Sequence, residues 1–361
     1  MKHRETKIVV AIDSFKGCLT STEANQAAAS GIHDVMPHAD VVQQAVSDGG
    51  EGWTEAFRSA IGGEYVETEA ADPLMRRIKV RYLITDSGIA VIETAKAIGL
   101  TLLTEKERNP VVASSYGVGQ LVADALCRGC RDIIVGLGGS GTSDCGEGML
   151  RALTDIFSAD GTWQTVRMPE DVHFTIATDV ENPLCGEKGA AHVFAPQKGA
   201  TPDMVERLEK RARLFADQSA LMLGHDYRNR NGAGAAGGLG YAFMQYMDAK
   251  CQSGAELLLD AMHFDKVIGN ASMIITGEGS ADRQTLMGKL PSVILQRAMR
   301  KNVPTCLIAG RIRDREELIR AGFAEAKCIN PDDITNEEAM MPEVAKKNIR
   351  KTLQHMFLDK K

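Results

Sequence analysis

The strongest constraint on the fold is a βα rhythm at both ends of the chain, in which β-rich runs end in acidic or glycine-rich loops. Residues 7–12 form a short apolar run before Asp13, and a helical pattern begins near Ser21. Residues 41–46 are a second run, which ends in DGGEG at 48–52. Runs at 272–276 and 305–309 repeat the pattern near the other end. Alternating strands and helices are typical of a parallel sheet covered by helices, with ligands beyond the carboxyl ends of the strands.

The middle of the chain follows a different pattern. Alternating or apolar runs at 65–68, 78–85 and 89–94 predict an antiparallel meander. Strands at 132–135 and 174–178 and a long helix from Thr201-Pro202 follow. We therefore predict an α/β protein with a flavodoxin-like parallel-sheet domain formed by both chain ends, residues 1–62 and 263–361. An inserted mixed α/β domain would span residues 63–262, with the active site in the cleft between the two domains.

Composition and charge narrow the range of partners. The 361 residues include 48 acidic and 42 basic side chains, and the net charge of −6 argues against binding to nucleic acid. No stretch approaches the roughly 18 apolar residues of a membrane span, and the first apolar run is too short for a signal peptide. Eight dispersed cysteines favour reduced thiols. We expect a cytoplasmic protein with small-molecule partners and no membrane partner; assembly into a homo-oligomer stays open.

Glycine is concentrated in four segments. They are DGGEG (48–52), GLGGSGTSDCGEG (136–148), NGAGAAGGLG (231–240) and TGEG (276–279), and three of them follow predicted strands. Glycine lets backbone amides approach an anion closely, so such loops at helix N-termini suit phosphate. The alternative interpretation is that each segment is only a tight turn.

Acidic and basic side chains near these loops suit phosphoryl transfer. That reaction needs Mg²⁺ ligands, cations beside the phosphate and a carboxylate beside the acceptor hydroxyl. The candidate oxygen ligands are Asp13, Asp48, Glu51, Asp144, Asp179, Glu278 and Asp282. The candidate cations are Lys16, Lys198, Arg283 and Lys289.

Two other functions fit part of the pattern. GLGGSG at 136–141 satisfies GxGxxG after a predicted strand, which makes a nicotinamide-dependent oxidoreductase the second interpretation. A non-catalytic nucleotide-binding protein is the third. Gly288-Lys289 lacks the rest of a Walker A motif, and the eight histidines lack the spacing of a zinc hydrolase.

An ordered series of motifs resembles the bacterial glycerate kinases of the first type. The motifs are DSFKG (13–17), SDGGEG (47–52), SSYGVGQL (114–121), GLGGSGTSDCGEGML (136–150), DVENPLCGEKGAAHVFAPQKGA (179–200), GAGAAGGLG (232–240) and TGEGSADRQTLMGKLP (276–291). The resemblance implies an enzyme that phosphorylates D-glycerate with ATP and Mg²⁺, commonly at the 2-hydroxyl. It also implies the two-domain architecture.

The same resemblance implies site residues at the matching positions. We predict Asp179, Lys16 and Asp48 as catalytic, with Asp179 as the carboxylate nearest the acceptor hydroxyl. Lys16 and Lys198 would clamp phosphate or carboxylate. The predicted metal ligands are Asp48, Glu278 and Asp282. The remaining matched positions are expected to contact substrate or nucleotide: Ser14, Gly138, Gly139, Ser140, Asp144, Asn182, Gln197, Gln284, Thr285 and Lys289.

Three positions depart from the family pattern. Cys145 stands where glycine is common, and Ser280 stands where a cation that could touch substrate is usual. Arg311 is an additional arginine at a late strand end. An arginine lost at one loop and gained at another would be compensation. We expect these changes to affect acceptor preference or affinity and to leave the reaction class unchanged.

Overall fold

The computed structural model describes residues 6–47 and 52–358, and the chain divides into two compact units. Unit 1 comprises residues 1–48 and 255–361, and unit 2 comprises residues 49–254. We expected the boundaries at 62/63 and 262/263. The first boundary lies earlier because α2 (Trp53–Ile61) contacts β4 and β5 of unit 2. The second lies earlier because α9 (Gly254–Ala261) is bound to unit 1, where its Glu256 and Asp260 form ion pairs with Arg297.

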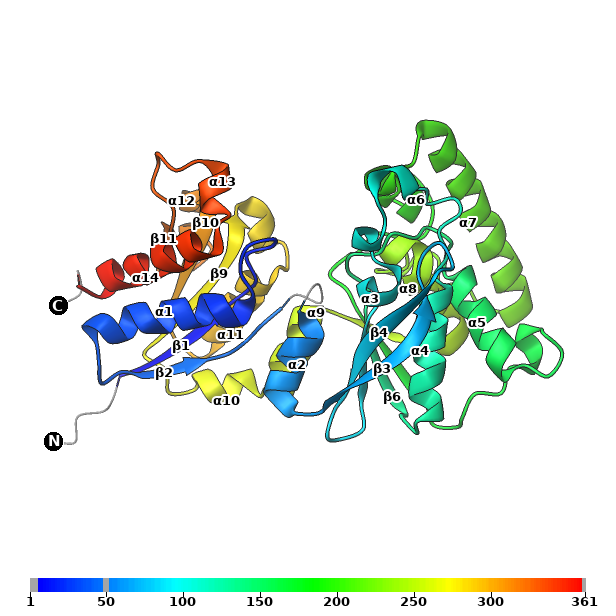
Figure 1. Ribbon diagram of the computed structural model, residues 1–361, viewed down its shortest axis with the longest axis horizontal. Helices are drawn as coiled ribbons and strands as arrows, with labels where there is room; N and C mark the ends of the chain where they lie inside the picture. Colours follow the sequence, from blue (N-terminus) through cyan, green and yellow to red (C-terminus); the bar gives the residue numbers. More distant parts are fainter. Residues whose placement is uncertain (1–5, 48–51, 359–361) are drawn as a thin grey trace. The chain divides into compact units, whose positions relative to one another are not determined.

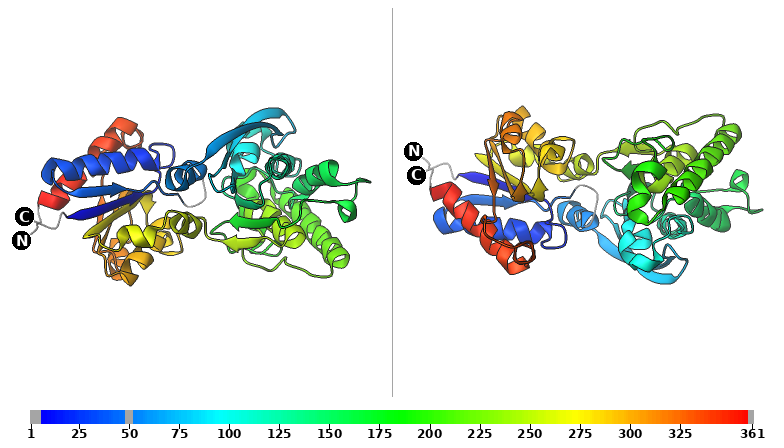
Figure 2. Two further views of the ribbon diagram at one scale, coloured as in Figure 1. Left: turned by 90° about the horizontal axis from the view of Figure 1, so that it is seen from below. Right: turned by 90° about the horizontal axis from the view of Figure 1, so that it is seen from above.

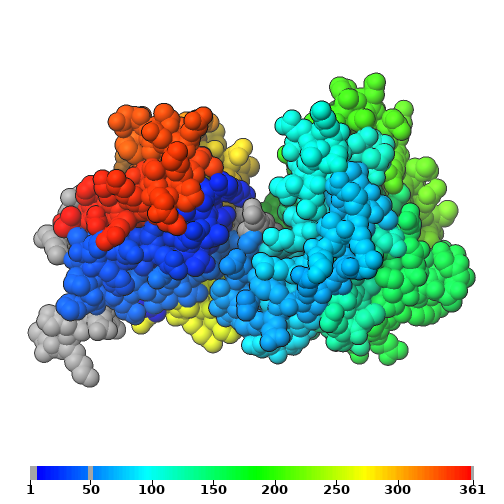
Figure 3. Space-filling view, viewed as in Figure 1, coloured from blue at the N-terminus to red at the C-terminus, as the bar shows by residue number. Residues whose placement is uncertain are grey.

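Unit 1 is built on a five-stranded parallel sheet. Its strands are β1 (Lys7–Ile12), β2 (Asp40–Gln43), β9 (Met273–Ala281), β10 (Thr305–Ile312) and β11 (Glu325–Cys328). Their order across the sheet is β11-β10-β9-β1-β2, and every neighbouring pair is parallel. This is the flavodoxin-like order, formed by strands from both ends of the chain as predicted. Figure 3 shows the N-terminal (blue) and C-terminal (red) segments side by side on one surface of the unit.

Helices cover both faces of this sheet (Figures 1 and 2). On one face, α1 (Ser21–Val35) and α14 (Pro342–Leu358) pack together, and Ile32 and Ile349 bury against Val10 of β1. On the other, α11 (Leu290–Arg300) and α12 (Arg315–Arg320) pack through Leu295 and Leu318. The predicted capping box of Thr20 and Glu23 starts α1. The shorter helices are α10 (Phe264–Ile268) and α13 (Asn336–Ala339).

Unit 2 contains a six-stranded mixed sheet. Its strands are β3 (Glu64–Ala71), β4 (Arg77–Ile84), β5 (Ala90–Glu93), β6 (Asp132–Gly136), β7 (His173–Ala177) and β8 (Lys250–Gln252), in that order. The pairs β3–β4 and β4–β5 are antiparallel, which confirms the predicted meander, and β5 to β8 are parallel. Besides α2, the α-helices of this unit are α3 (Ala95–Ile98), α4 (Tyr116–Cys127), α5 (Glu147–Phe157), α6 (Ala190–Phe194), α7 (Pro202–Leu223) and α8 (Ala235–Met247).

One extended core fills unit 2. Ile92, Val135 and Ile176 come from three adjacent parallel strands and are buried with Leu121 of α4 and Phe243 of α8. Because helices pack against these strands, the sheet is rigid and holds the polar loops that follow the carboxyl ends of the strands. In the described part of the chain, no helix has the length and apolar character needed to span a membrane.

Candidate active site

A large cavity of unit 1 lies at the carboxyl ends of its parallel strands. It has a volume of about 750 Å³ and is lined by residues at or beyond the ends of β1, β9, β10 and β11. This is the edge at which open α/β sheets bind ligands. The cavity brings together five of the predicted site residues, namely Asp13, Ser14, Lys16, Glu278 and Lys289.

Asp13 and Glu278 extend from neighbouring strands. The register of β1 and β9 pairs Ile12 with Gly277, so the next residue on each strand is a carboxylate that lines the same cavity. Asp13 is buried, and one of its oxygens accepts a hydrogen bond from Ser14 N at 2.7 Å. Lys16 follows in the same loop and is exposed. Two acids and a cation therefore meet at one strand edge.

Glu278 is held by two side chains from the segment that follows β9. Its Oε1 accepts a hydrogen bond from Thr285 Oγ1 at 2.6 Å, and its Oε2 lies 3.4 Å from Lys289 Nζ. Burial raises the pKa of the Glu278 carboxyl, and the bond from Thr285 and the charge of Lys289 oppose that rise. The carboxylate form would be stabilised further by any cation that entered the cavity.

Asp282 and Gln284, predicted at the site, lie outside the cavity lining. Asp282 caps the 3₁₀ turn Arg283–Leu286, where its side chain accepts a hydrogen bond from Gln284 N at 2.8 Å. Neither residue lines the cavity, and Gln284 is exposed. The cap fixes the turn that carries Thr285, so Asp282 acts on Glu278 through that threonine.

Two of the positions that depart from the family pattern lie opposite one another in the sheet: Ser280, where a cation is usual, and Arg311, the additional arginine. In the ladder between β9 and β10, Arg311 is the direct partner of Ser280, and both residues line the cavity. A side chain at either position therefore enters the same space.

In unit 2, the glycine-rich loop between β6 and α5 is organised by Asp144. This buried carboxylate accepts hydrogen bonds from Ser115 N at 2.7 Å, Ser115 Oγ at 2.9 Å, Gly146 N at 3.2 Å and Gly148 N at 3.1 Å. Several donors to one carboxylate give a rigid connection. Asp144 therefore holds the loop in shape, and Gly138 and Gly139 at the start of the loop remain exposed.

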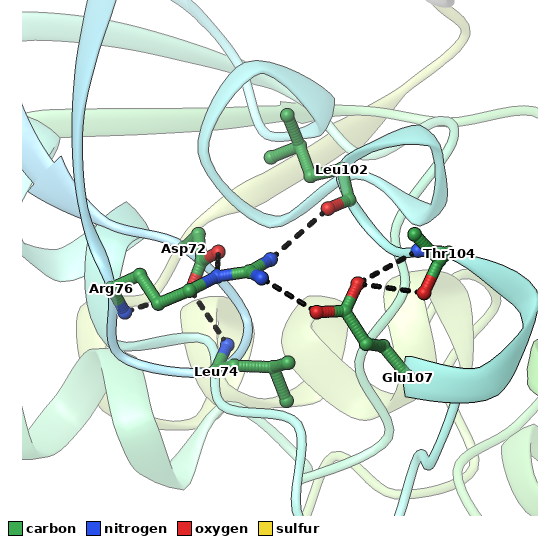
Figure 4. Close-up of polar contacts among 6 residues, drawn as sticks. All are labelled: Asp72, Leu74, Arg76, Leu102, Thr104 and Glu107. Carbon is green, nitrogen blue, oxygen red and sulfur yellow. Dashed lines mark hydrogen bonds and ion pairs between the residues drawn. The ribbon is translucent and has the colours of Figure 1, made fainter.

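The β3–β4 turn, which contacts the residue before Ser115, is held by the polar network shown in Figure 4. Asp72 pairs with Arg76, whose guanidinium donates to Glu107 Oε1 at 2.7 Å. The network fixes the β3–β4 turn, and Pro73 O in that turn accepts a hydrogen bond from Ser114 N at 2.9 Å. A connection thus runs from the meander to the glycine-rich loop.

Lys198 lies beneath this loop. Its side chain is buried, and its Nζ donates to Ser140 Oγ at 3.1 Å and to Thr142 O at 2.6 Å. Burial lowers the pKa of the Lys198 ammonium to about 8, while the Asp144 carboxylate opposes that change. The predicted clamp on phosphate is thus a buried group whose hydrogen bonds go to the loop, so we now propose that Lys198 positions the loop.

Cys145, which departs from the family pattern, stands at a backbone position that favours glycine. Its φ of +55° lies in the left-handed region, which glycine adopts without strain. Burial raises the pKa of its thiol well above the ordinary value, so the side chain is suited to packing. Gly237 of the adjacent glycine segment has φ +67°, and a Cβ there would lie 2.1 Å from Thr142 O. The two glycine-rich segments therefore pack backbone to backbone.

Asp179 and Asn182 follow β7, next to the glycine-rich loop that follows β6. Asp179 is exposed, and Asn182 Nδ2 donates to Lys188 O at 2.8 Å, which fixes the local turn. Gln197 is exposed on the 3₁₀ turn that also carries Lys198. Asp48, predicted as both catalytic and metal-binding, and Glu51 lie outside the described residues.

Other residues of the cavity were missed from the sequence. Asn330 and Asp332 follow the short last strand, where an Asn-Pro-Asp sequence was the available signal. Phe15 and Met340 are apolar, and nothing in their sequence context marks a site. Among the residues that the structure describes, no group of three or more His, Cys, Asp or Glu side chains has the arrangement of a metal site.

Comparisons with known proteins point to one family. The model of the glycerate kinase family matches residues 8–166 and 159–359. Glycerate kinase from Bacillus subtilis (strain 168) is 37% identical over 354 residues, covering 92% of each chain. Glycerate 2-kinase from Escherichia coli (strain K12) is 36% identical over 327 residues, covering 85% of this chain and 86% of its own. A crystal structure described as "putative glycerate kinase 2 from Salmonella typhimurium LT2" aligns with a TM-score of 0.84 at 35% identity, covering 99% of this chain and 98% of that one.

The fold and the comparisons together define an α/β kinase built from two units. The chain belongs to the glycerate kinase family, and it is an enzyme, a glycerate kinase. The GxGxxG segment that suggested an oxidoreductase does not lead directly into a helix, because α5 begins only at Glu147.

Proposed function

We propose that this enzyme transfers the γ-phosphoryl group of ATP to D-glycerate, with the 2-hydroxyl as the preferred acceptor. The observation that carries the proposal is the cavity of unit 1, where Asp13 and Glu278 meet Lys16, Lys289 and Arg311. Phosphoryl transfer needs this combination of acids and cations and little covalent chemistry. The name of the Escherichia coli relative, a glycerate 2-kinase, supports the 2-hydroxyl.

The described residues fit Mg²⁺ bound together with a nucleotide. Mg²⁺ commonly takes only one or two protein carboxylates and completes its shell with phosphate oxygens and water. Asp13 and Glu278, on adjacent strands of one cavity, supply that number of carboxylates. Asp48 stays a proposed ligand from the sequence, and so does Asp282, whose side chain caps a turn in the structure. When bound, the ion would neutralise charge on the phosphates.

The chain's own residues would do the remaining work by position and charge. Lys16 and Lys289 would hold phosphate oxygens as point charges. Asp179 stays our candidate for the group that accepts the proton of the attacking hydroxyl. Asp144 and Lys198, through Ser115, Ser140 and Thr142, would keep the glycine-rich loop in one conformation for the bound acid.

The proposal is tested by ³¹P NMR of a reaction with ATP, Mg²⁺ and D-glycerate. We expect ADP and a phosphomonoester coupled to the proton on C2, which identifies 2-phosphoglycerate. Coupling to the C3 methylene protons would identify the 3-phosphate and contradict the 2-hydroxyl preference. Asp179→Asn should lower kcat roughly a hundredfold or more, because a positioned base contributes about that much. Asp203→Asn, at an exposed aspartate of α7, is the matched control and should retain normal turnover.

A further inference from the structure

The cavity of unit 1 is far larger than a three-carbon acid requires. Its volume of about 750 Å³ is in the range of sites that enclose nucleotide-sized or drug-sized ligands. It also lies where the strand order reverses, since β1 connects to β2 on one side and neighbours β9 on the other. Ligands of open α/β sheets collect at such a switch point.

Two basic side chains line the cavity. Lys289 immediately precedes α11, and Arg311 lies near the end of β10. Arg311 is exposed, and among the described residues its side chain makes no hydrogen bond or ion pair. Its partner in the ladder is Ser280, whose short side chain also lines the cavity. A planar guanidinium with free donors suits phosphate oxygens.

Part of the cavity lining is apolar. Here the loop after β1 meets α13: Cys18 Sγ lies 4.0 Å from Ala339 O, and Met340 Cε lies 3.4 Å from the Cβ position of Gly17. Phe15 and Met340 both line the cavity; Phe15 is only 5% exposed, whereas Met340 is 49% exposed. The flexible thioether of Met340 can adapt to a flat heterocycle.

From these lining residues, we propose that unit 1 binds the whole nucleotide in this cavity, with the base against the exposed Met340 and the phosphates against Lys289 and Arg311. Arg311 thereby supplies from β10 the cation that is missing at Ser280 on β9. The inference rests on the proposed function, because that function makes ATP the phosphate donor. It goes further by assigning the two ends of ATP to different side chains of one cavity.

The test measures binding of ATP and of inorganic tripolyphosphate separately, by displacement of a fluorescent ATP analogue with no glycerate present. Arg311→Ala should raise the Kd of both ligands about tenfold, the typical effect of losing a charge-assisted hydrogen bond. Met340→Ala should raise the Kd of ATP about fivefold, because the shorter side chain loses about half of the apolar contact that methionine would make with the base. It should leave the Kd of tripolyphosphate unchanged, since that ligand has no base.

Matched controls come from the same segments. Arg313→Ala and Met341→Ala remove equally exposed side chains that do not line the cavity, and both should bind ATP as the wild type does. Equal melting temperatures would show that all four variants fold.

The inference is overturned if neither cavity variant changes the Kd of ATP beyond twofold, or if Met340→Ala weakens tripolyphosphate as much as ATP. A wild-type enzyme that turns over glycerate alongside such results keeps its proposed function. Conversely, the expected binding pattern without any glycerate turnover would refute the proposed function and leave the nucleotide site standing.

Discussion

Replacing Lys198 with methionine should change how the stability of unit 2 depends on pH. The Lys198 ammonium is buried under the glycine-rich loop, and burial lowers its pKa from 10.5 to about 8. Between these two values the unfolded chain binds a proton that the folded chain has lost. The free energy of unfolding therefore rises with pH in this window, relative to a variant without the amine.

The size of the effect follows from the pKa. A lowering from 10.5 to about 8 corresponds to about 3 kcal/mol, spread over the interval between the two values. Lys198→Met also loses the hydrogen bonds to Ser140 and Thr142. The stability difference between wild type and Lys198→Met should thus grow by about 3 kcal/mol from pH 7.5 to pH 10.5, with the wild type gaining.

Tryptophan fluorescence during denaturant unfolding is a suitable assay. The chain has two tryptophans, Trp53 and Trp163, and both lie in unit 2 with Lys198. Other titrating groups are present in both proteins, so their effects cancel in the difference. Lys210→Met, at an exposed lysine of α7, is the control and should give a small difference at every pH. A wild-type advantage that stays constant, or that shrinks as pH rises, would refute the buried-amine interpretation.

Three further substitutions test the site. Asp144→Asn should destabilise unit 2 by about 1–3 kcal/mol, since an amide cannot accept all four bonds, whereas the exposed Asp155→Asn should have little effect on the same unfolding curve. Gly237→Ala places a Cβ 2.1 Å from Thr142 O and should lower the free energy of unfolding by about 2–4 kcal/mol. The control Gly161→Ala, with φ +79° but open space around the Cβ position, should lower it by only about 1–2 kcal/mol. Equal losses of stability in the two variants would contradict the close packing at Gly237. Glu278→Gln should raise the Mg²⁺ concentration for half-maximal activity roughly tenfold, and an unchanged Mg²⁺ titration would exclude it as a ligand.

Much of unit 1 could be predicted because its signals are local. Strand, loop and helix succeed one another in the sequence, and Thr20 and Glu23 mark the start of α1 by a capping box. Parallel pairing then brings the loops after β1 and β9 to one edge, so Asp13 and Glu278 could be expected to meet.

The remaining features depend on packing between distant segments. The register that sets Arg311 opposite Ser280 has no local signature, because a shift of one residue would turn the arginine to the other face. The burial of Lys198 depends on how the turn at 196–198 packs under the loop after β6. Met340 reaches the cavity from a segment more than three hundred residues after Phe15, and an apolar side chain carries no chemical label in the sequence.

The most direct test of the account is the initial rate of ADP formation from ATP and Mg²⁺ with D-glycerate, with L-glycerate and without an acceptor. We predict saturable ADP formation with D-glycerate, slower formation with L-glycerate and a negligible rate with neither. ADP formation that is independent of glycerate, or ATP binding with no turnover on D-glycerate, would contradict the proposed reaction.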